Sequence, residues 1–243
     1  MLRQVTLPVR GEPVRGPENL VYSTAPNLSL GSDGIRYYTK GEDDVRVVLA
    51  EAIAYTFAKT IEIPIPDFAI GFYSDSPSPV FASVIVPDAC RNIIPWFRRA
   101  KVSNMGILSR LIVFDTWLAN NDRNLGNLLG TPTAPDPCSI DLVAIDFEKS
   151  LTVRSKAPSI EVPTLSPSAF WPRGDLGTFC KTLAPWDPIA VQIVDSIPDS
   201  YVDSTVNAAV LATGADISIA DSMCYILKQR KSRIENLARE VWT

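Results

Sequence analysis

The segment Asn121-Asp122-Arg123-Asn124-Leu125-Gly126-Asn127 decides how this chain of 243 residues is interpreted. Apolar residues at helical spacing precede it over 104–119 and predict a long, buried helix. Asp122 therefore follows directly after that helix, in a loop, where proteins commonly display functional side chains. The loop and the strands after it are the part of the sequence that points most clearly to chemistry.

A β-hairpin is predicted immediately after this loop. Asn127 opens a short strand near 127–129, the proline-rich turn 131–137 reverses the chain, and the return strand 142–145 ends at Asp146. In an antiparallel hairpin the start of the first strand lies beside the end of the second. We therefore expect Asn127 and Asp146 to be neighbours, with the loop aspartate a few residues upstream.

This grouping of side chains suits phosphoryl transfer. Two carboxylates, Asp122 and Asp146, and the carboxamide of Asn127 provide the hard oxygen ligands that Mg²⁺ prefers. Phosphoryl transfer further needs a cation on the phosphates and a group that orients the attacking hydroxyl. Lys40, at the end of a predicted strand, is the candidate cation. Glu51, in the helix that follows, is placed to pair with it.

The composition excludes several other kinds of chemistry. The chain has no histidine, which rules out Ser-His-Asp and Cys-His catalysis and histidine-bound zinc. The net charge of −4 gives no basic excess, so we expect no direct binding of nucleic acid. The four cysteines lie more than 40 residues apart and form no metal knuckle. With neither a signal peptide nor a membrane span in the sequence, we expect a cytoplasmic protein.

The order of predicted elements indicates an α+β fold with two lobes. Strands are expected over 20–22, 35–40, 68–73 and 80–86, with a helix capped by Asp43 or Asp44 and running to Lys59. After Pro87 the pattern becomes helical, with further helices over 189–197 and 219–242. We therefore divide the chain into a small β-rich N-lobe, residues 1–87, and a larger helical C-lobe, residues 88–243.

Several of these segments resemble the HipA-like kinases of the protein-kinase-like superfamily. The Asp-Arg-Asn-Leu-Gly-Asn run at 122–127 resembles the D-R-H-x-x-N catalytic loop that those kinases share with phosphatidylinositol kinases. The segment 144–147, Ala-Ile-Asp-Phe, resembles their metal-binding strand end, where other kinases have the DFG aspartate. The segment 194–199 is similar to a late helix-and-proline feature of the HipA-like group. The resemblance spans most of residues 30–200.

The resemblance implies a protein-kinase-like fold with ATP between the two lobes. It also implies a role for each candidate residue. Asp122 is the catalytic base, and Asn127 and Asp146 are the Mg²⁺ ligands. Lys40 holds the ATP phosphates, and Glu51 positions Lys40. Any transfer then depends on ATP and Mg²⁺ as cofactors.

The sequence departs from the family pattern at two positions of the site. Asn124 stands where the family usually has histidine, and Glu148 follows Asp146-Phe147 where glycine is common. No clear glycine-rich phosphate loop precedes Lys40. The poor glycine loop and the altered Asp146-Phe147-Glu148 favour one alternative, a nucleotide-binding pseudokinase that works as an interaction module.

The leading interpretation is a toxin-type serine/threonine protein kinase. Its expected partners are a protein substrate that offers a Ser or Thr hydroxyl and a neutralising antitoxin-type protein. A kinase acting on a lipid or another small molecule is the second alternative, because phosphatidylinositol kinases share the catalytic loop.

Overall fold

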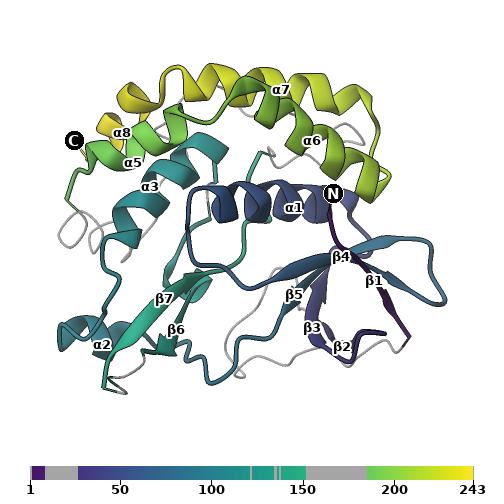
Figure 1. Ribbon diagram of the computed structural model, residues 1–243, viewed down its shortest axis with the longest axis horizontal. Coiled ribbons are helices and arrows are strands. Elements are labelled where there is room, and N and C mark those ends of the chain that lie inside the picture. Colours follow the sequence, from purple (N-terminus) through teal and green to yellow (C-terminus); the bar gives the residue numbers. More distant parts are fainter. Residues whose placement is uncertain are drawn as a thin grey trace.

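The structure is a computed structural model, and it describes residues 2–8, 27–120, 122–133, 136, 138–151 and 185–242 (Figure 1). Its strands are β1 (Gln4–Leu7), β2 (Asn27–Leu30), β3 (Arg36–Lys40), β4 (Phe68–Tyr73), β5 (Pro79–Val84), β6 (Leu128–Pro132) and β7 (Ile140–Ala144). Its helices are α1 (Val45–Thr60), α2 (Ile94–Arg98), α3 (Ile107–Leu118), the 3₁₀ turn η1 (Leu125–Asn127), α5 (Pro188–Asp195), α6 (Asp199–Thr213), α7 (Ser218–Lys231) and α8 (Ile234–Trp242). The arrangement is α+β, as predicted.

The N-terminal region is a curled sheet of five strands in the order β1-β4-β5-β3-β2. The strand β1 pairs parallel to β4, and the other pairings are antiparallel. The backbone N–H of Ser32, in the turn after β2, donates to the carbonyl of Thr6 in β1 at 2.8 Å, so the two ends of the sheet meet. Because side chains alternate along a strand, Tyr37 and Thr39 of β3 are buried inside the curl, whereas Lys40 points to the opposite face, toward α1.

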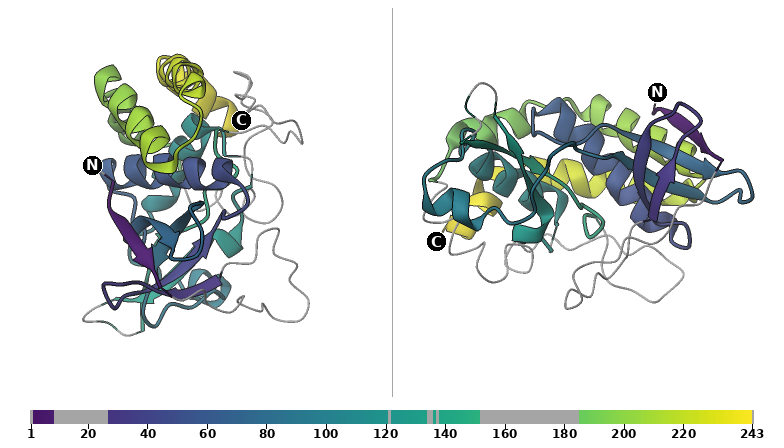
Figure 2. Two further views of the ribbon diagram at one scale, coloured as in Figure 1. Left: turned by 90° about the vertical axis from the view of Figure 1, so that its right-hand side faces the viewer. Right: turned by 90° about the horizontal axis from the view of Figure 1, so that it is seen from below.

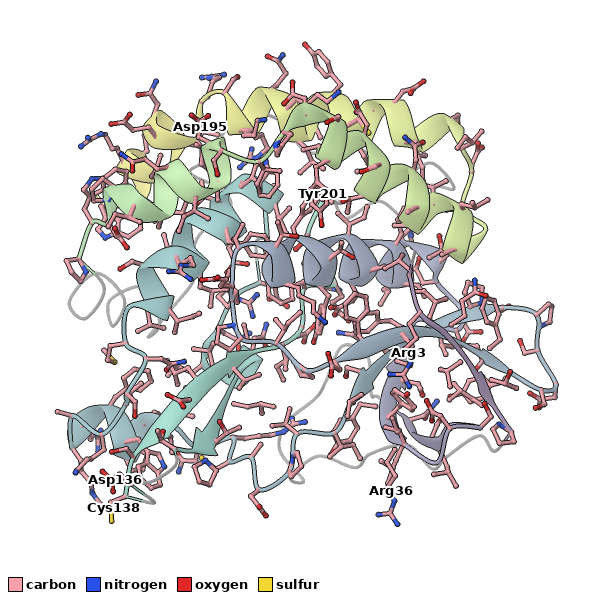
Figure 3. All side chains as sticks on the ribbon, in the orientation of Figure 1. Arg3, Arg36, Asp136, Cys138, Asp195 and Tyr201 are labelled. Carbon is pink, nitrogen blue, oxygen red and sulfur yellow. The ribbon has the colours of Figure 1, made fainter. Side chains whose placement is uncertain are left out.

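The helix α1 is buried between this sheet and the C-terminal helices (Figures 1 and 2). Asp44 caps its first turn by accepting the backbone N–H of Arg46 at 3.0 Å. Eleven of its sixteen residues are buried, as expected for a helix that is apolar on all sides. Phe57 packs on Trp117 of α3 with ring centroids 4.7 Å apart, and the Thr60 hydroxyl lies 2.8 Å from that of Tyr201 in α6 (Figure 3). One hydrophobic core thus joins α1 to the helical region and fixes the position of Glu51.

The helix α3 leads into the loop and hairpin that the sequence singled out. It is buried almost throughout, and the residue that caps its C-terminal end, Ala119, adopts the left-handed conformation with φ 53°. The antiparallel pairing of β6 with β7 sets Leu128 opposite Ala144. The predicted strands 35–40, 68–73 and 80–86, the helices beginning after Asp44 and Asp187, and the hairpin are confirmed within two or three residues at each end.

The C-terminal helices differ from the prediction. The helix predicted over 219–242 is wrong as a single element, because the chain breaks at 232–233 into α7 and α8. The helix α7 packs mainly on α6, whereas α8 packs on α3 and α5, so the chain changes direction between the two helices. The helix α6 was not predicted. The strand expected over 20–22 lies outside the described residues, and the lobe boundary at residue 87 stays a prediction.

Candidate active site

Lys40 is surrounded by three carboxylates. Its Nζ atom forms an ion pair with Glu51 of α1, lies 2.7 Å from Oδ1 of Asp146 and lies 3.7 Å from Oε2 of Glu148. The pairing of Lys40 with Glu51 expected from the sequence is therefore present. The three carboxylates exceed the one ammonium, which makes the cluster locally negative even though Lys149 also contacts Glu148 at 2.8 Å. A negative cluster that contains a lysine and the partly exposed Asp146 suits a cation together with an anionic ligand.

The carboxylate of Glu51 is fully buried and binds two segments of the chain. Its Oε1 atom accepts the backbone N–H of Phe147 at 3.0 Å and also contacts Lys40, while Oε2 is buried without a hydrogen-bond partner among the described residues. Burial raises the pKa of Glu51 to about 7, although the positive charge of Lys40 lowers it. Glu51 thereby ties α1 to the strand end that carries Asp146.

Lys40 and Asp146 are both held in their charged forms. Burial by itself lowers the pKa of Lys40, but the charges of Asp146, Glu51 and Glu148 outweigh burial and raise it well above its usual value. Burial opposes ionisation of Asp146, yet Lys40 and then Arg123 lower its pKa below the usual value. At neutral pH the cluster therefore contains an ammonium and an ionised aspartate.

Asp146 adopts an unusual backbone conformation. Its φ is 63°, in the left-handed region that side chains with a Cβ avoid, and strain of this kind concentrates at functional sites. The turn out of β7 leaves the Asp146 side chain 36% exposed, whereas that of Glu51 is 0% exposed. Of the two, Asp146 is the carboxylate that an incoming ligand can reach.

The loop after α3 is held by short-range hydrogen bonds around Asp122. The carbonyl of Asp122 accepts the side-chain amides of Asn124 at 2.9 Å and Asn127 at 3.0 Å, and its N–H donates to Asn120 at 3.2 Å. The Asn124 side chain also accepts the N–H of Gly126 at 2.8 Å. Asn124, at the position where the family usually has histidine, thus closes the loop locally.

Asn127 and Asp146 are neighbours, as the hairpin argument predicted. Asn127 ends the turn η1 immediately before β6, so the predicted strand starts one residue later. The N–H of Ile145 donates to the carbonyl of Asn127 at 3.0 Å, which joins the two strand ends. Because the amide nitrogen of Asn127 donates to Asp122, the oxygen is the end of the carboxamide that remains to bind a ligand. A carboxylate and a carboxamide oxygen fit the ligand preference of Mg²⁺.

A buried ion pair beneath this loop was missed by the sequence reasoning. Arg123 and Asp115 are 1% and 0% exposed, and Nε of Arg123 lies 2.7 Å from Oδ2 of Asp115. Arg123 also donates to the carbonyls of Asn127 at 3.1 Å and Ile145 at 2.5 Å. The available signal was an aspartate inside an apolar helix, because a charged residue there needs a buried partner.

The comparison with protein families assigns the chain to a class of kinases. The family model of the HipA-like kinases matches residues 22–154, which is more than half of the chain. The chain therefore belongs to the HipA-like kinase family, a family of phosphotransferases.

A comparison with solved structures agrees with this assignment at the level of the fold. The crystal structure of the Helicobacter pylori proinflammatory kinase CtkA is similar with a TM-score of 0.53 and 12% sequence identity, covering 100% of this chain and 99% of that one. No curated protein matches the sequence. Within the described residues no helix combines the length and apolarity needed to cross a membrane.

Proposed function

We propose that this protein transfers the γ-phosphoryl group of ATP, in the presence of Mg²⁺, to a Ser or Thr hydroxyl of a protein. The observation that carries the proposal is the contact of Lys40 with both Glu51 and Asp146. It brings together a strand, a helix and a hairpin that are far apart in the sequence. Membership of the HipA-like kinase family supports the same chemistry.

Each residue then has a defined role. Lys40 binds the ATP phosphates, and the buried Glu51 holds the lysine side chain in place. Asn127 and Asp146 hold Mg²⁺, which supplies positive charge to the phosphates during transfer. Asp122, displayed by the loop after α3, orients the acceptor hydroxyl and receives its proton.

The biological part of the proposal rests on the family resemblance. A toxin-type protein kinase, kept inactive by a neutralising partner protein, is the role that we propose for this chain. The acceptor is a protein hydroxyl in this proposal, and a lipid hydroxyl is the outcome against which it is tested.

The experiment is transfer of radioactive phosphate from ATP to a generic protein substrate, with and without Mg²⁺. Asp122→Asn and Asp146→Asn keep the size of the side chain and remove its charge, and each is expected to lower the rate about 10²–10⁴-fold. Asp195→Asn is the matched control, because Asp195 is an exposed carboxylate on α5, on the far side of the molecule from the hairpin (Figure 3). Its transfer rate is expected to equal that of the unsubstituted protein.

The outcomes separate the alternatives. Labelling of protein that needs Mg²⁺ and disappears in both site variants supports the proposal. Labelling of phosphoinositide vesicles in place of protein indicates a lipid kinase. Labelling that persists in both variants contradicts the assigned roles, and ATP binding without any transfer indicates a pseudokinase.

A further inference from the structure

The ion pair between Arg123 and Asp115 lies directly beneath the candidate site. Both side chains are inaccessible to solvent, and the pair is bidentate, with Nε to Oδ2 at 2.7 Å and Nη2 to Oδ1 at 3.1 Å. Burial raises the pKa of Asp115, and Arg123 opposes this rise. A buried ion pair contributes little net stability compared with an apolar pair of the same shape. Its position therefore suggests a role other than stability.

The remaining donors of Arg123 hold two backbone segments together. Nη1 donates to the carbonyl of Asn127 and to that of Ile145, the residue immediately before Asp146. The guanidinium also lies over the ring of Phe147, with Cζ 4.3 Å from the ring centroid. Arg123 thus contacts residue 127 and both neighbours of residue 146.

Asp115 extends the same network to the third candidate residue. Its Oδ1 atom accepts the side-chain amide of Asn120 at 2.8 Å, and Oδ1 of Asn120 accepts the N–H of Asp122 at 3.2 Å. The backbone of Asp122, the backbone of Asn127 and the carbonyl of Ile145, directly before Asp146, are therefore connected to one buried ion pair. These residues come from two segments, 115–127 and 145–147, and the hydrogen bonds of Arg123 join the two segments in addition to the pairing of β6 with β7.

We infer that Arg123, oriented by Asp115, is a positioning residue that sets the distance between Asn127 and Asp146 by holding the backbone of both. This inference rests on the proposed function, since it concerns the same metal-binding pair. Only a guanidinium has the planar arrangement of donors that reaches a carboxylate and two carbonyls at once, and lysine lacks it. Residues that orient metal ligands without touching the metal typically affect affinity or activity 10–100-fold.

The test compares Arg123→Lys with Arg230→Lys. Arg230 is an equally buried arginine that donates to the carbonyls of Thr116 and Trp117 in α3, so its substitution disturbs the same core. The first readout is Mn²⁺ binding to the protein, measured by electron paramagnetic resonance in the absence of nucleotide. The second is kcat and the KM for ATP at saturating Mg²⁺. Thermal unfolding of each variant reports the loss of stability.

Arg123→Lys is expected to weaken Mn²⁺ binding and to lower kcat, each about 10–100-fold, with a smaller change in KM. Arg230→Lys is expected to lose stability while its Mn²⁺ affinity and kcat stay within about twofold of the unsubstituted protein, because a change in the core alone leaves the spacing of the metal ligands intact. If Arg123→Lys does not fold, Asp115→Asn is measured against the same criterion, since it keeps the side-chain size and removes the charge that orients Arg123.

Two results have separate meanings. If the unsubstituted protein binds Mn²⁺ and transfers phosphate, but Arg123→Lys behaves like Arg230→Lys in both readouts, the inference is overturned and the proposed function stands. If the unsubstituted protein binds no Mn²⁺ and transfers no phosphate, the proposed function itself fails.

Discussion

Replacing Lys40 by methionine removes the ammonium that faces the fully buried carboxylate of Glu51. The carboxylate then has Asp146 nearby and no paired cation, so both burial and a like charge oppose its ionisation. Removing one partner of a buried ion pair destabilises a protein by about 3–5 kcal/mol. Protonation of Glu51 relieves part of this loss, which makes the effect depend on pH.

The sign and size of the pH dependence follow from the pKa of Glu51. In the folded protein this pKa is about 7, above the usual value of 4.5, so the folded state binds a proton that the unfolded state has lost. The free energy of unfolding therefore falls as pH rises from the unfolded pKa to the folded pKa, by at most about 1.4 kcal/mol per pH unit. Over the two units between about pH 6 and about pH 8, this slope would lower the free energy of unfolding by at most about 2.7 kcal/mol. The unsubstituted protein loses about half of that amount, because the titration of Glu51 ends near the middle of the range.

In Lys40→Met the pKa of Glu51 in the folded protein rises further. The free energy of unfolding is therefore expected to keep falling from about pH 6 to about pH 8, by close to the full ~2.7 kcal/mol. The destabilisation caused by the substitution is then about 1.4 kcal/mol larger at about pH 8 than at about pH 6. Because the chain contains no histidine, few other groups titrate in this range.

Urea unfolding followed by tryptophan fluorescence measures these differences. Lys59→Met is the control, since the Lys59 side chain is 71% exposed and lies at the end of the same helix. The double variant Lys40→Met/Glu51→Gln is expected to lose the added pH dependence. Equal destabilisation by Lys40→Met at both pH values would refute the reasoning.

Three further predictions concern stability. Ala119→Gly is expected to stabilise the protein by about 1 kcal/mol, because glycine adopts the φ of 53° without the strain of a Cβ. A higher midpoint of urea unfolding would confirm this prediction, and an unchanged midpoint would contradict it. Trp117→Phe removes the buried hydrogen bond from Nε1 to the carbonyl of Leu227 at 2.9 Å and is expected to lower the free energy of unfolding by about 1–3 kcal/mol in the same assay. Asp44→Ala removes the cap of α1 and is expected to lower thermal stability by about 1 kcal/mol, while Asp43→Ala, next to it and not the cap, has little effect.

Much of the candidate site was predictable because it depends on short-range order. The loop follows a helix with a clear apolar period, and the proline-rich turn gives the two strands after it opposite directions. Those two facts are sufficient to place Asn127 beside Asp146. The pairing of Lys40 with Glu51 was also predictable, since a strand end and the middle of the next helix lie close together when the connecting turn is short.

The remainder depends on contacts between distant segments. The sequence between 219 and 242 is apolar on one face throughout, and the break between α7 and α8 follows from their different neighbours, α6 for α7 and α3 with α5 for α8. Similarly, the approach of Glu148 to Lys40 depends on how the chain leaves β7, where Asp146 adopts a positive φ.

The amino-acid sequence by itself determined the α+β class, the elements that carry the candidate site residues and the identity of the polar residues in the loop and hairpin, because these follow from local periodicity, capping and turn chemistry. The tertiary structure alone decided that Arg123 is buried on Asp115 and bonded to the carbonyls directly before and directly after the hairpin. The physical reason is the desolvation of charge. A buried guanidinium must find partners for its donors, and which carbonyls lie within reach is known only once helix α3 and both strands are packed together.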